Sequence, residues 1–396
     1  MKIGISSPIT LDKFLDYLFP EFHQIAIEIE GLKAPAVDTI VLGLLENGHS
    51  VSIYTLSERI DDMKILKGNN LTIFVAPLIN HKWWRLFGIF TYKANQIKKC
   101  VRADFNQVDL IHAHWTYEYA AGVILGTKQI PIVVTIRDWI PFILRFKHFY
   151  YYFIVRYFID YFVFNHKRVN FIANSQYIAK LVKQKWSIDV PVIPNSVSNF
   201  FLSPKKGSKR ETFNIISIST SVDNRKNIEP LVKAFSLFNS KYKKSKLFLI
   251  GNAFTEKNFG VIRWKTEGLL DNVELLGSIK HYDLIKILDN SDVLVHPSLE
   301  ESFGNVIIEA IARKVPVIAG KNSGAVPFVL LQGEIGFLCD VTSPISIFES
   351  IEYLYKNSSY RKELIENAYD YLLKNYTQEK TVEKHLRYYQ KIISKI

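Results

Sequence analysis

The sequence predicts an α/β protein built from two doubly wound, Rossmann-like domains, and three observations lead to this prediction. Short apolar segments alternate with longer segments of helical periodicity along most of the chain. The apolar segments are apolar throughout, as expected for parallel strands that helices cover on both faces. The length of 396 residues exceeds what a single core holds and suits two domains of ordinary size.

The first series of elements fills the N-terminal half of the chain. Residues 37–47 (VDTIVLGLLEN) have helical periodicity, and Gly48 follows as a C-cap. An acidic helical segment, residues 11–30, separates the first strand from this helix. Strands are predicted at residues 1–6, 51–55, 71–76, 110–112, 132–136, 170–173 and 192–193.

The composition changes near residue 198, where SNFFLSPKKGSKRET (198–212) is polar and basic and predicts a linker. A second series of strands follows, with helical segments between them and a helical tail over residues 358–396. These strands are predicted at residues 213–219, 246–251, 273–276, 293–296 and 315–319. Because ligands of such sheets bind beyond the carboxyl ends of the strands, we expect the site in a central cleft between the two domains.

The composition excludes several classes of protein. Two cysteines far apart in sequence, Cys100 and Cys339, form no metal or redox motif and indicate a reducing compartment. The N-terminus lacks the basic segment of a signal peptide, and no segment has the roughly 18 uncharged apolar residues of a membrane span.

The net charge of +12 is concentrated in residues 82–185, which hold 16 Lys and Arg against 5 Asp and Glu. This region is also aromatic, notably in HKWWRLFGIF (81–90) and in residues 145–168. Three interpretations remain open: a helix with a buried aromatic face and a solvated basic face, a surface that binds anionic lipid, or a nucleic-acid site. Because no nucleic-acid-binding motif accompanies the charge, we expect no nucleic-acid partner.

The segment with the strongest chemical signal is residues 293–314. The strand VLVH ends at a proline, and the helix NVIIEAIARK begins just after Gly304, so the intervening loop lies at the carboxyl end of a strand. A helix N-terminus in this position can bind an anion, and Gly304 allows a ligand close to the backbone. Glu301 and Glu309 are suited to accept hydrogen bonds from sugar hydroxyls; alternatively, they only oppose the helix macrodipole.

The stretch HPSLEESFGNVIIEAIARKVPVIA resembles the glutamate–seven–glutamate motif of the group 1, family 4 glycosyltransferases. These are retaining, nucleotide-sugar-dependent enzymes of GT-B fold. The resemblance covers most of the chain in order, through VLGLLENGHSVSIYT, VDLIHAHW, FIANSQYIAKLV, VPVIPNSV and ISISTSVDNRKNIEPLVKAF. It implies an acceptor domain over residues 1–198, a nucleotide-sugar domain over residues 199–375, and a final helix, residues 376–396, that returns to the first domain.

The resemblance also implies roles for residues of the second domain. Glu309 would bind the ribose hydroxyls of the nucleotide, and Glu301 would contact the donor sugar near the reacting carbon. Lys226, with Arg225 beside it, would contact the diphosphate and stabilise the leaving group. The donor would further contact a set of consecutive residues and one strand-end glycine: Ser302, Phe303, Gly304, Asn305, Val306 and Gly277.

In the first domain, Arg137 of TIRDWIP falls where the family has a histidine. Arg137 stays protonated and cannot act as a base, but it could hold a phosphate or an acceptor carboxylate. Together with Asp138, which the family shares, Arg137 is assigned to catalysis. His112, His114 and Gly31 are assigned to the acceptor side, although each histidine taken alone favours a structural role.

Three further positions depart from the family pattern. Thr220 stands where an arginine is common, and Arg225 either replaces that charge or is merely solvated. Lys314 replaces a usual glycine. Phe328 stands where the family has an acid in the loop that contacts the donor sugar.

The implied function is transfer of a sugar from a UDP- or GDP-sugar to a hydroxyl of a glycan acceptor, with retention of configuration. The resemblance implies that no metal or other cofactor is needed, and the sequence has no D-x-D pair that would hold a metal. The expected acceptor is lipid-linked, and the expected location is cytoplasmic, at the inner face of the membrane. Two alternatives stay open: a non-catalytic GT-B partner of an active transferase, motivated by Arg137, Thr220 and Phe328, and a nucleotide-sugar epimerase.

Overall fold

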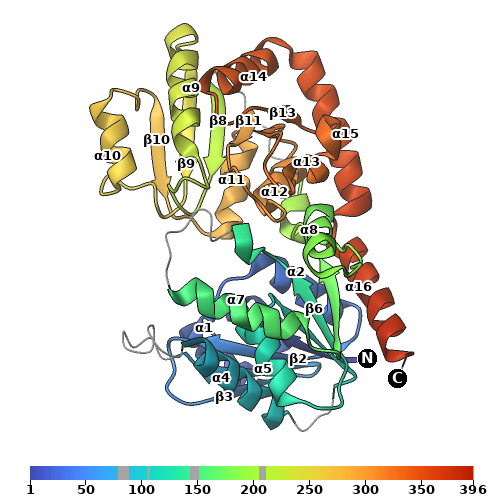
Figure 1. Cartoon of the computed structure of the whole chain (residues 1–396). Coiled ribbons are helices and arrows are strands. Elements are labelled where there is room, and N and C mark those ends of the chain that lie inside the picture. The colour runs from blue at the N-terminus through green and yellow to red at the C-terminus, as the bar shows by residue number, and fades with distance from the viewer. Residues whose placement is uncertain (79–88, 105–107, 143–150, 205–210, 396) are drawn as a thin grey trace. The chain divides into compact units, whose positions relative to one another are not determined.

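The structure is a computed structural model that describes residues 1–78, 89–104, 108–142, 151–204 and 211–395. It divides into two compact units: unit 1 comprises Met1–Ser196 and Gln378–Ile396, and unit 2 comprises Val197–Thr377. Each unit has its own largely parallel sheet, flanked by helices (Figure 1). Two Rossmann-like α/β domains are therefore present, as the sequence predicts.

The sheet of unit 1 has seven strands among the described residues, in the order β3-β4-β2-β1-β5-β6-β7. Neighbouring strands are parallel except for β3, which pairs antiparallel with β4 at one edge. The strand order reverses between β1 and β5, which is where doubly wound sheets bind ligands. The bounds are β1 Lys2–Ser6, β2 Ser50–Ser57, β3 Lys64–Lys67, β4 Leu71–Pro77, β5 Leu110–His114, β6 Ile132–Ile136 and β7 Val169–Ala173.

Two details of this sheet differ from the prediction. The strand β3 was not predicted, because only Leu66 of its four residues is buried and its lysines are typical of an edge strand. Residues 192–193 form a single bridge, between Ala173 and Val192, and not a strand. The prolines on either side of this dipeptide have no N–H group with which to extend the ladder.

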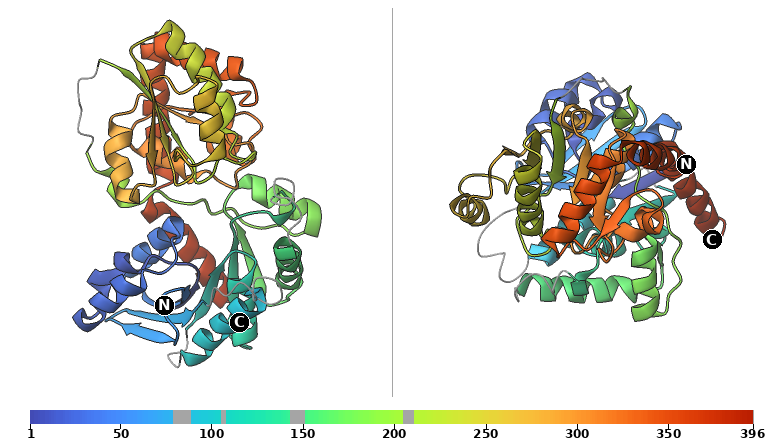
Figure 2. Two further views of the ribbon diagram at one scale, coloured as in Figure 1. Left: turned by 90° about the vertical axis from the view of Figure 1, so that its left-hand side faces the viewer. Right: turned by 90° about the horizontal axis from the view of Figure 1, so that it is seen from above.

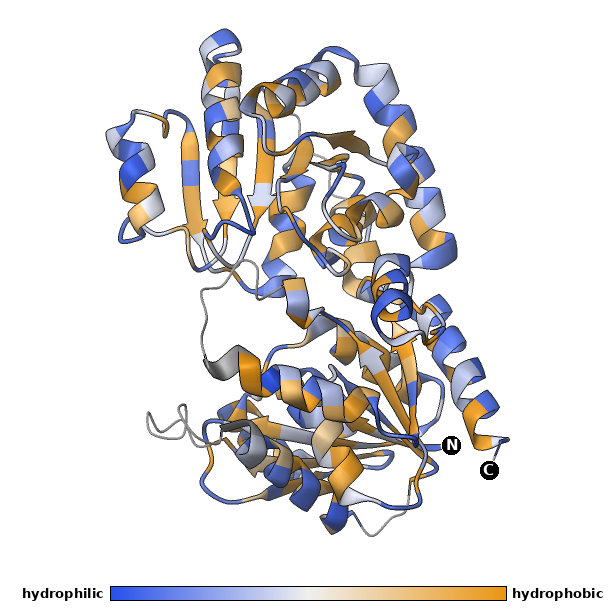
Figure 3. Cartoon of the chain, viewed as in Figure 1, coloured by the Kyte–Doolittle hydropathy of each residue, from blue (hydrophilic) through white to orange (hydrophobic). Residues whose placement is uncertain are grey.

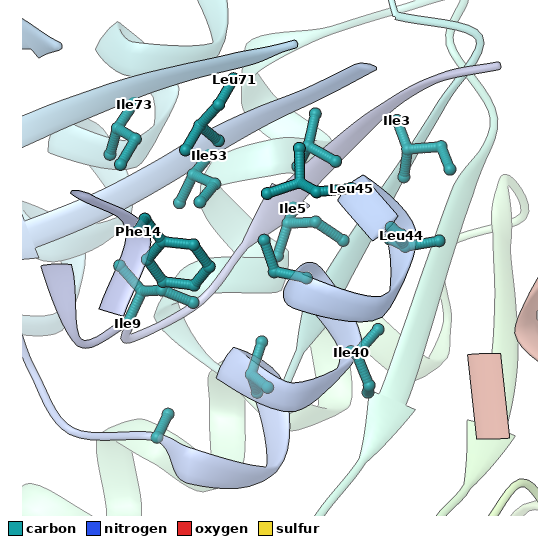
Figure 4. Close-up of a cluster of buried hydrophobic side chains, with 14 of the residues drawn as sticks. Ile3, Ile5, Ile9, Phe14, Ile40, Leu44, Leu45, Ile53, Leu71 and Ile73 are labelled. Carbon is teal, nitrogen blue, oxygen red and sulfur yellow. The ribbon is translucent and has the colours of Figure 1, made fainter. Parts of the chain in front are cut away.

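Helices cover both faces of the unit 1 sheet, and each face has its own cluster of buried side chains. On one face, Ile3 and Ile5 of β1 and Ile53 of β2 pack against α2 and Phe14 (Figure 4). The helices of unit 1 are η1 Leu11–Tyr17, η2 Pro20–Phe22, α1 His23–Ile29, α2 Pro35–Glu46, α4 Ile89–Ala103, α5 Glu118–Gly126, α7 Tyr151–Phe164, α8 Gln176–Trp186 and α16 Gln378–Ile393. The expected C-cap is present, since Gly48 follows α2 with φ of +75°.

The sheet of unit 2 has six parallel strands among the described residues, in the order β10-β9-β8-β11-β12-β13. Hydrophobic residues run along most of the strands, whereas the helices have mixed faces (Figure 3). The strand β13 was not predicted, because it has only three residues. The bounds are β8 Phe213–Ile218, β9 Ser245–Ile250, β10 Val273–Gly277, β11 Val293–His296, β12 Val317–Gly320 and β13 Phe337–Cys339.

Helices also lie on both faces of this second sheet (Figure 2). Because Pro316 has no N–H group for the ladder, β12 begins two residues later than predicted. The helices of unit 2 are η3 Asn199–Leu202, α9 Ile228–Lys241, α10 Phe259–Thr266, η4 His281–Asp283, α11 Leu284–Asp289, α12 Asn305–Ala312, α13 Val326–Val329, η5 Leu331–Gly333, α14 Pro344–Lys356 and α15 Ser358–Asn375.

The start of the predicted linker belongs to the core of unit 2. Phe201 of η3 is fully buried, and the buried Arg313 donates hydrogen bonds to the carbonyl oxygens of Phe201 and Ser203, at 2.8 and 2.5 Å. Arg313 also forms two 2.8 Å bonds with the carboxylate of Asp289. The linker prediction is therefore wrong for residues 198–203, and residues 205–210 lie outside the described residues.

The helical tail divides between the two units. The helix α15 ends at Asn375, the carbonyl oxygen of Tyr376 accepts a hydrogen bond from the N–H group of Val197, and α16 then packs in unit 1. Parts of the basic aromatic stretches, residues 81–88 and 145–150, lie outside the described residues. Within the described part of the chain, no helix combines the length and the apolar character that crossing a bilayer requires.

Candidate functional site

The loop between β11 and α12 is the centre of the candidate site in unit 2. The strand β11 ends at the buried His296, and α12 begins at Asn305 with Gly304 as its N-cap. Gly304 has φ of +92°, which favours glycine, and no side chain caps the helix. The first N–H groups of α12 are thus free of a side-chain cap, and a helix N-terminus in this state suits an anion.

Glu301 lies in this loop and pairs with a lysine that is 75 residues away in sequence. Its Oε1 atom lies 2.5 Å from Nζ of Lys226 and 3.3 Å from Nε2 of His296. Burial by itself raises the pKa of Glu301, but the charge of Lys226 and the adjacent His296 lower it well below its ordinary value. The carboxylate is therefore ionised and can act only as an acceptor of hydrogen bonds.

The segment that carries Lys226 is fastened to the loop after β11. The N–H group of Lys226 donates to Oδ1 of Asp223 at 2.9 Å. Asn227, with φ of +52°, donates to the carbonyl oxygens of Pro297 and Val341 at 3.1 and 2.9 Å. Arg225 donates from Nη1 to the carbonyl oxygen of Glu300 at 3.3 Å. These bonds hold both cationic side chains beside the N-terminal turn of α12.

Glu309 lies on α12 and is largely buried. Its Oε1 atom lies 2.8 Å from Nε2 of His281, and the His281 ring packs edge-on against Phe200 and Phe201. Sequence reasoning missed both His281 and His296. His296 had a signal, since it is the last residue of a predicted strand at the edge where ligands bind, whereas His281 precedes Glu309 by 28 residues in a segment without a motif.

The remaining residues predicted to contact the donor lie around the N-terminus of α12, except for Gly277, which is the last residue of β10. Ser302 and Val306 are half-buried, so their backbone and side chains are partly accessible. Phe303 is buried against Tyr376 at a ring distance of 5.7 Å, so its side chain belongs to the core of unit 2. Gly277 ends β10 with φ of +61°. The structure thus places all of the predicted donor residues in unit 2, and their contacts with a ligand stay a prediction.

In unit 1, Arg137 is buried at the end of β6 and makes two side-chain hydrogen bonds. Its Nε donates to Nδ1 of His114 at 3.1 Å, and its Nη1 donates to Oδ1 of Asn195 at 2.7 Å. The guanidinium also lies 5.7 Å from the ring centre of Trp115. Burial lowers the pKa of Arg137 to about 10, so the group stays charged at neutral pH.

His112 and His114 are both fully buried in unit 1. The two ring nitrogens of His112 bond to the hydroxyls of Tyr389 and Thr135, at 2.6 and 2.7 Å. Burial, with the nearby positive groups, lowers the pKa of both histidines well below its ordinary value. His112 therefore attaches α16 to the sheet, and its assignment to the acceptor side stays a prediction.

Two other predicted residues of unit 1 have clear local roles. Asp138 accepts a short hydrogen bond from the hydroxyl of Tyr117. Gly31 has φ of +73°, and a Cβ atom there would lie 2.3 Å from the carbonyl oxygen of Ile9. Gly31 is thus required by the close approach of two backbone segments.

The structure also describes the three positions that depart from the family pattern. Thr220 is exposed, and Lys314 has φ of +52°, the left-handed conformation that glycine adopts without strain. Phe328 is half-buried on α13. Across the described ranges, no group of three or more His, Cys, Asp or Glu side chains could hold a metal ion.

Comparison with known proteins matches both halves of the chain. Residues 36–198 match the family model described as Glycosyltransferase Family 4, and residues 200–371 match the model described as Glycosyl transferases group 1. The capsular polysaccharide biosynthesis glycosyltransferase CapM of Staphylococcus aureus is 36% identical over 144 residues, which are 36% of this chain and 37% of CapM. The match thus spans little more than a third of that relative.

Two further proteins resemble the chain over a larger part of its length. The uncharacterized glycosyltransferase MJ1178 of Methanocaldococcus jannaschii is 26% identical over 289 residues, which are 72% of this chain and 76% of MJ1178. The sucrose-phosphate synthase of Thermosynechococcus elongatus superposes with a TM-score of 0.76 at 19% identity and covers 100% of both chains, which shows a shared fold.

The matched models account for most of the chain, and their order agrees with the two Rossmann-like units. The sequence prediction of the family and of the GT-B fold is confirmed. The chain belongs to the group 1, family 4 glycosyltransferases.

Proposed function

We propose that this glycosyltransferase moves a sugar from a UDP- or GDP-sugar to a hydroxyl group of a glycan acceptor and retains the anomeric configuration. The observation that carries the proposal is the buried pair of Lys226 and Glu301 beside the N-terminus of α12. This arrangement sets a fixed cation and a helix N-terminus without a side-chain cap next to an ionised carboxylate. A nucleotide-sugar has a matching order of groups, because its diphosphate lies between hydroxyl-bearing rings.

The proposed chemistry assigns a separate task to each group. Lys226 and the N–H groups of α12 stabilise the negative charge that develops on the diphosphate as the bond to the sugar breaks. Glu301 accepts hydrogen bonds from the donor sugar near the reacting carbon, and Glu309 accepts them from the ribose. Because Lys226, Arg225 and α12 supply the positive charge, we propose that the reaction needs no metal ion.

The proposed acceptor is a lipid-linked glycan of a cell-surface polysaccharide, and the name of the similar CapM supports this class. The proposed location is cytoplasmic, at the inner face of the membrane. On α7, the aromatic side chains of Phe158, Tyr161 and Phe162 are exposed, and such side chains can enter a lipid interface. Arg156 does not belong to that surface, because it pairs with Glu118 at 3.1 Å and lies over the ring of Tyr117.

Vesicle sedimentation tests the membrane part of the proposal. Two substitutions on α7, Phe158→Ser and Phe162→Ser, are expected to reduce sedimentation with anionic phosphatidylglycerol vesicles. Leu237→Ser is the matched control, because Leu237 is an exposed apolar residue of α9 in unit 2. Equal sedimentation of the wild type and all variants would contradict a role for α7 at a membrane. Equal sedimentation of the wild type with charged and with uncharged vesicles would contradict it as well.

A second candidate function is a non-catalytic partner that binds a nucleotide-sugar or a glycan. The observation that favours it is Arg137, which occupies the histidine position of the family and is bonded to His114 and Asn195. Release of nucleotide from a donor separates the two functions. If the wild type hydrolyses one donor of a panel and Glu309→Ala does not, the chain is an enzyme; if neither hydrolyses any donor, the partner function is favoured.

Thermal unfolding with UDP, GDP and their sugars is the first experiment for the donor. A ligand that binds only the folded state raises stability with the logarithm of its concentration. We expect one nucleotide and its sugars to stabilise the wild type and to have little effect on Glu309→Ala. Equal stabilisation of both proteins would contradict the assignment of Glu309 to the ribose.

A further inference from the structure

Unit 2 contains a cavity that none of the paired site residues Lys226, Glu301, Glu309 and His281 lines. Its volume is about 820 Å³, within the range of roughly 300–1,000 Å³ that small-molecule sites occupy. Its walls are the N-terminal turns of α9 and α10, the segment of residues 222–227, and the residues around Thr342. The two helices follow successive strands of the sheet, β8 and β9 (Figure 1).

The charged side chains that line this cavity are balanced and already paired. Glu229 forms an ion pair with Lys233 at 2.8 Å and a shorter one with Arg263. Hydrogen bonding from Lys233 and the charges of both cations hold the pKa of Glu229 below its ordinary value, although burial opposes this. Asp223 contributes the other acidic side chain and bonds to the backbone of Lys226. With equal numbers of acids and bases, the lining suits a neutral ligand and not a phosphate or a carboxylate.

Two aromatic residues, Phe259 and Trp264, also line this cavity. Phe259, at the first turn of α10, is 82% exposed, which is unusual for a large apolar side chain. Trp264 is 1% exposed, and its Nε1 atom has no hydrogen-bond partner among the described residues. Because this atom has almost no accessible surface, Trp264 lines the cavity without being assigned as a hydrogen-bond donor to a ligand.

The lack of a side chain at Gly260 contributes to the opening beside Trp264. A Cβ atom at Gly260 would lie 3.1 Å from the side chain of Val222 and 3.9 Å from the indole ring of Trp264. Asn224, Asn227 and Asn258 also line the cavity, although Nδ2 of Asn227 and Oδ1 of Asn258 are engaged in hydrogen bonds within the protein. Amides, paired charges and an exposed ring together offer hydrogen bonds to hydroxyl groups and a flat surface to C–H groups.

We infer that this cavity binds a neutral segment of a glycan, as a carbohydrate site separate from the donor site. The assignment of the ligand as a glycan of the acceptor class rests on the proposed function. The segment of residues 223–227 lies between the two sites. Arg225 bonds to Glu300 and Lys226 pairs with Glu301, whereas Asn224 and Asn227 line the cavity. A glycan held there contacts the same segment that holds the donor cations.

Calorimetric titration of the full chain with free neutral oligosaccharides tests this inference. The probes are hexamers of α1,4-linked glucose, β1,3-linked glucose and β1,4-linked N-acetylglucosamine. At least one is expected to bind, and Phe259→Ala is expected to weaken that binding by at least about tenfold, or about 1.4 kcal/mol. Ile262→Ala is the matched control, because Ile262 is exposed on α10 and does not line the cavity; it should change binding by less than about twofold.

A second measurement places the ligand beside Trp264. In protein labelled with 5-fluorotryptophan, the ¹⁹F resonance that Trp264→Phe removes is expected to shift when the oligosaccharide binds. No binding by any of the three hexamers, equal effects of Phe259→Ala and Ile262→Ala, or displacement of the hexamer by inorganic phosphate would each overturn the inference. Two further titrations separate this inference from the proposed function. Glu309→Ala should still bind the oligosaccharide if the two sites are separate, and Phe259→Ala should still bind the nucleotide.

Discussion

Nζ of Lys226 lies 2.5 Å from Oε1 of Glu301, and both side chains are largely buried at the carboxyl end of the unit 2 sheet. Two buried opposite charges in such contact are costly to separate, because removal of one leaves the other without compensation. The pair therefore serves two purposes under the proposed function: it keeps Glu301 ionised, and it holds a cation where the diphosphate is expected.

Lys226→Met is expected to reduce turnover of the donor by about 10²–10³-fold, the loss typical of removing one preorganised electrostatic group. Donor hydrolysis or transfer under saturating donor measures the effect on kcat. Lys241→Met is the control, since Lys241 forms an exposed pair with Glu352 at 2.7 Å and such pairs contribute little. A loss of activity as large in Lys241→Met as in Lys226→Met would contradict the prediction.

The same pair predicts a pH dependence of stability. Glu301 has a folded-state pKa below its ordinary value of 4.5, so its contribution is fully present above pH 4.5 and is lost as the pH falls below 4.5. Lys226→Met removes this contribution. We expect the free energy of unfolding in urea to differ between wild type and variant at pH 7, and the difference to shrink as the pH falls below 4.5; a difference that grows at low pH would contradict the linkage.

Glu309→Gln is expected to weaken nucleotide binding by roughly 10–100-fold, because a hydrogen bond to a charged group contributes about 1.5–3 kcal/mol. His281→Phe removes the bond to Glu309 but keeps an aromatic ring against Phe200 and Phe201, so a smaller loss is expected. Calorimetry with UDP and GDP measures both. Tyr282→Phe is the control, because Tyr282 is 67% exposed; equal affinities in His281→Phe and Tyr282→Phe would exclude a role for His281.

Asp160→Asn is expected to stabilise unit 1 at alkaline pH. Burial raises the pKa of Asp160 to about 7, although a bond from Thr116 and the charge of Lys185 oppose the rise. Folding therefore favours the protonated form, and stability falls as the pH rises from the ordinary value of 3.8 through 7. The free energy of unfolding of Asp160→Asn should exceed that of the wild type by about 1–3 kcal/mol at pH 8, with no difference near pH 4; an equal gain at both pH values would indicate a cause other than ionisation.

Arg313→Met is expected to destabilise unit 2 by about 3–5 kcal/mol, because it leaves Asp289 charged and buried without its partner. Arg313→Met combined with Asp289→Leu should recover part of the loss, but not all, since the carbonyl oxygens of Phe201 and Ser203 also lose a donor. Urea unfolding of the two variants measures both effects. A double variant that is less stable than Arg313→Met would contradict the role given to the ion pair.

Sequence patterns predicted most of the strands and the helices α2, α12, α15 and α16, because buried parallel strands are uniformly apolar and these helices are periodic. The patterns failed where local signals were weak. The strand β3 is mostly exposed, β13 has three residues, and residues 198–203 look like a linker although Arg313, more than 100 residues later, anchors them. Contacts of that sequence separation leave no trace in local periodicity.

The candidate site, like the fold, could be predicted from the sequence only in part. The motif around Glu301, Gly304 and Glu309 was legible in sequence, because the strand end, the glycine and the helix start are consecutive. The partners of the two carboxylates were harder to predict from sequence. Lys226 was expected near the donor by resemblance, whereas His296 and His281 were missed.

The sequence by itself determined the two α/β units through local hydrophobic patterns, and the family through its resemblance over most of the chain. It also set the order of the residues proposed for the donor site, most of which lie in one contiguous motif. Only the tertiary structure decided which side chains meet. Folding brings Lys226 to Glu301, and the charge of Lys226 lowers the pKa of that carboxyl against the effect of burial. Folding also encloses Arg137 with His114 and Asn195 and arranges Phe259 and Trp264 around a cavity. The energies of hydrogen bonds and of charge interactions depend on distances in space, and these distances are fixed only when both sheets have folded.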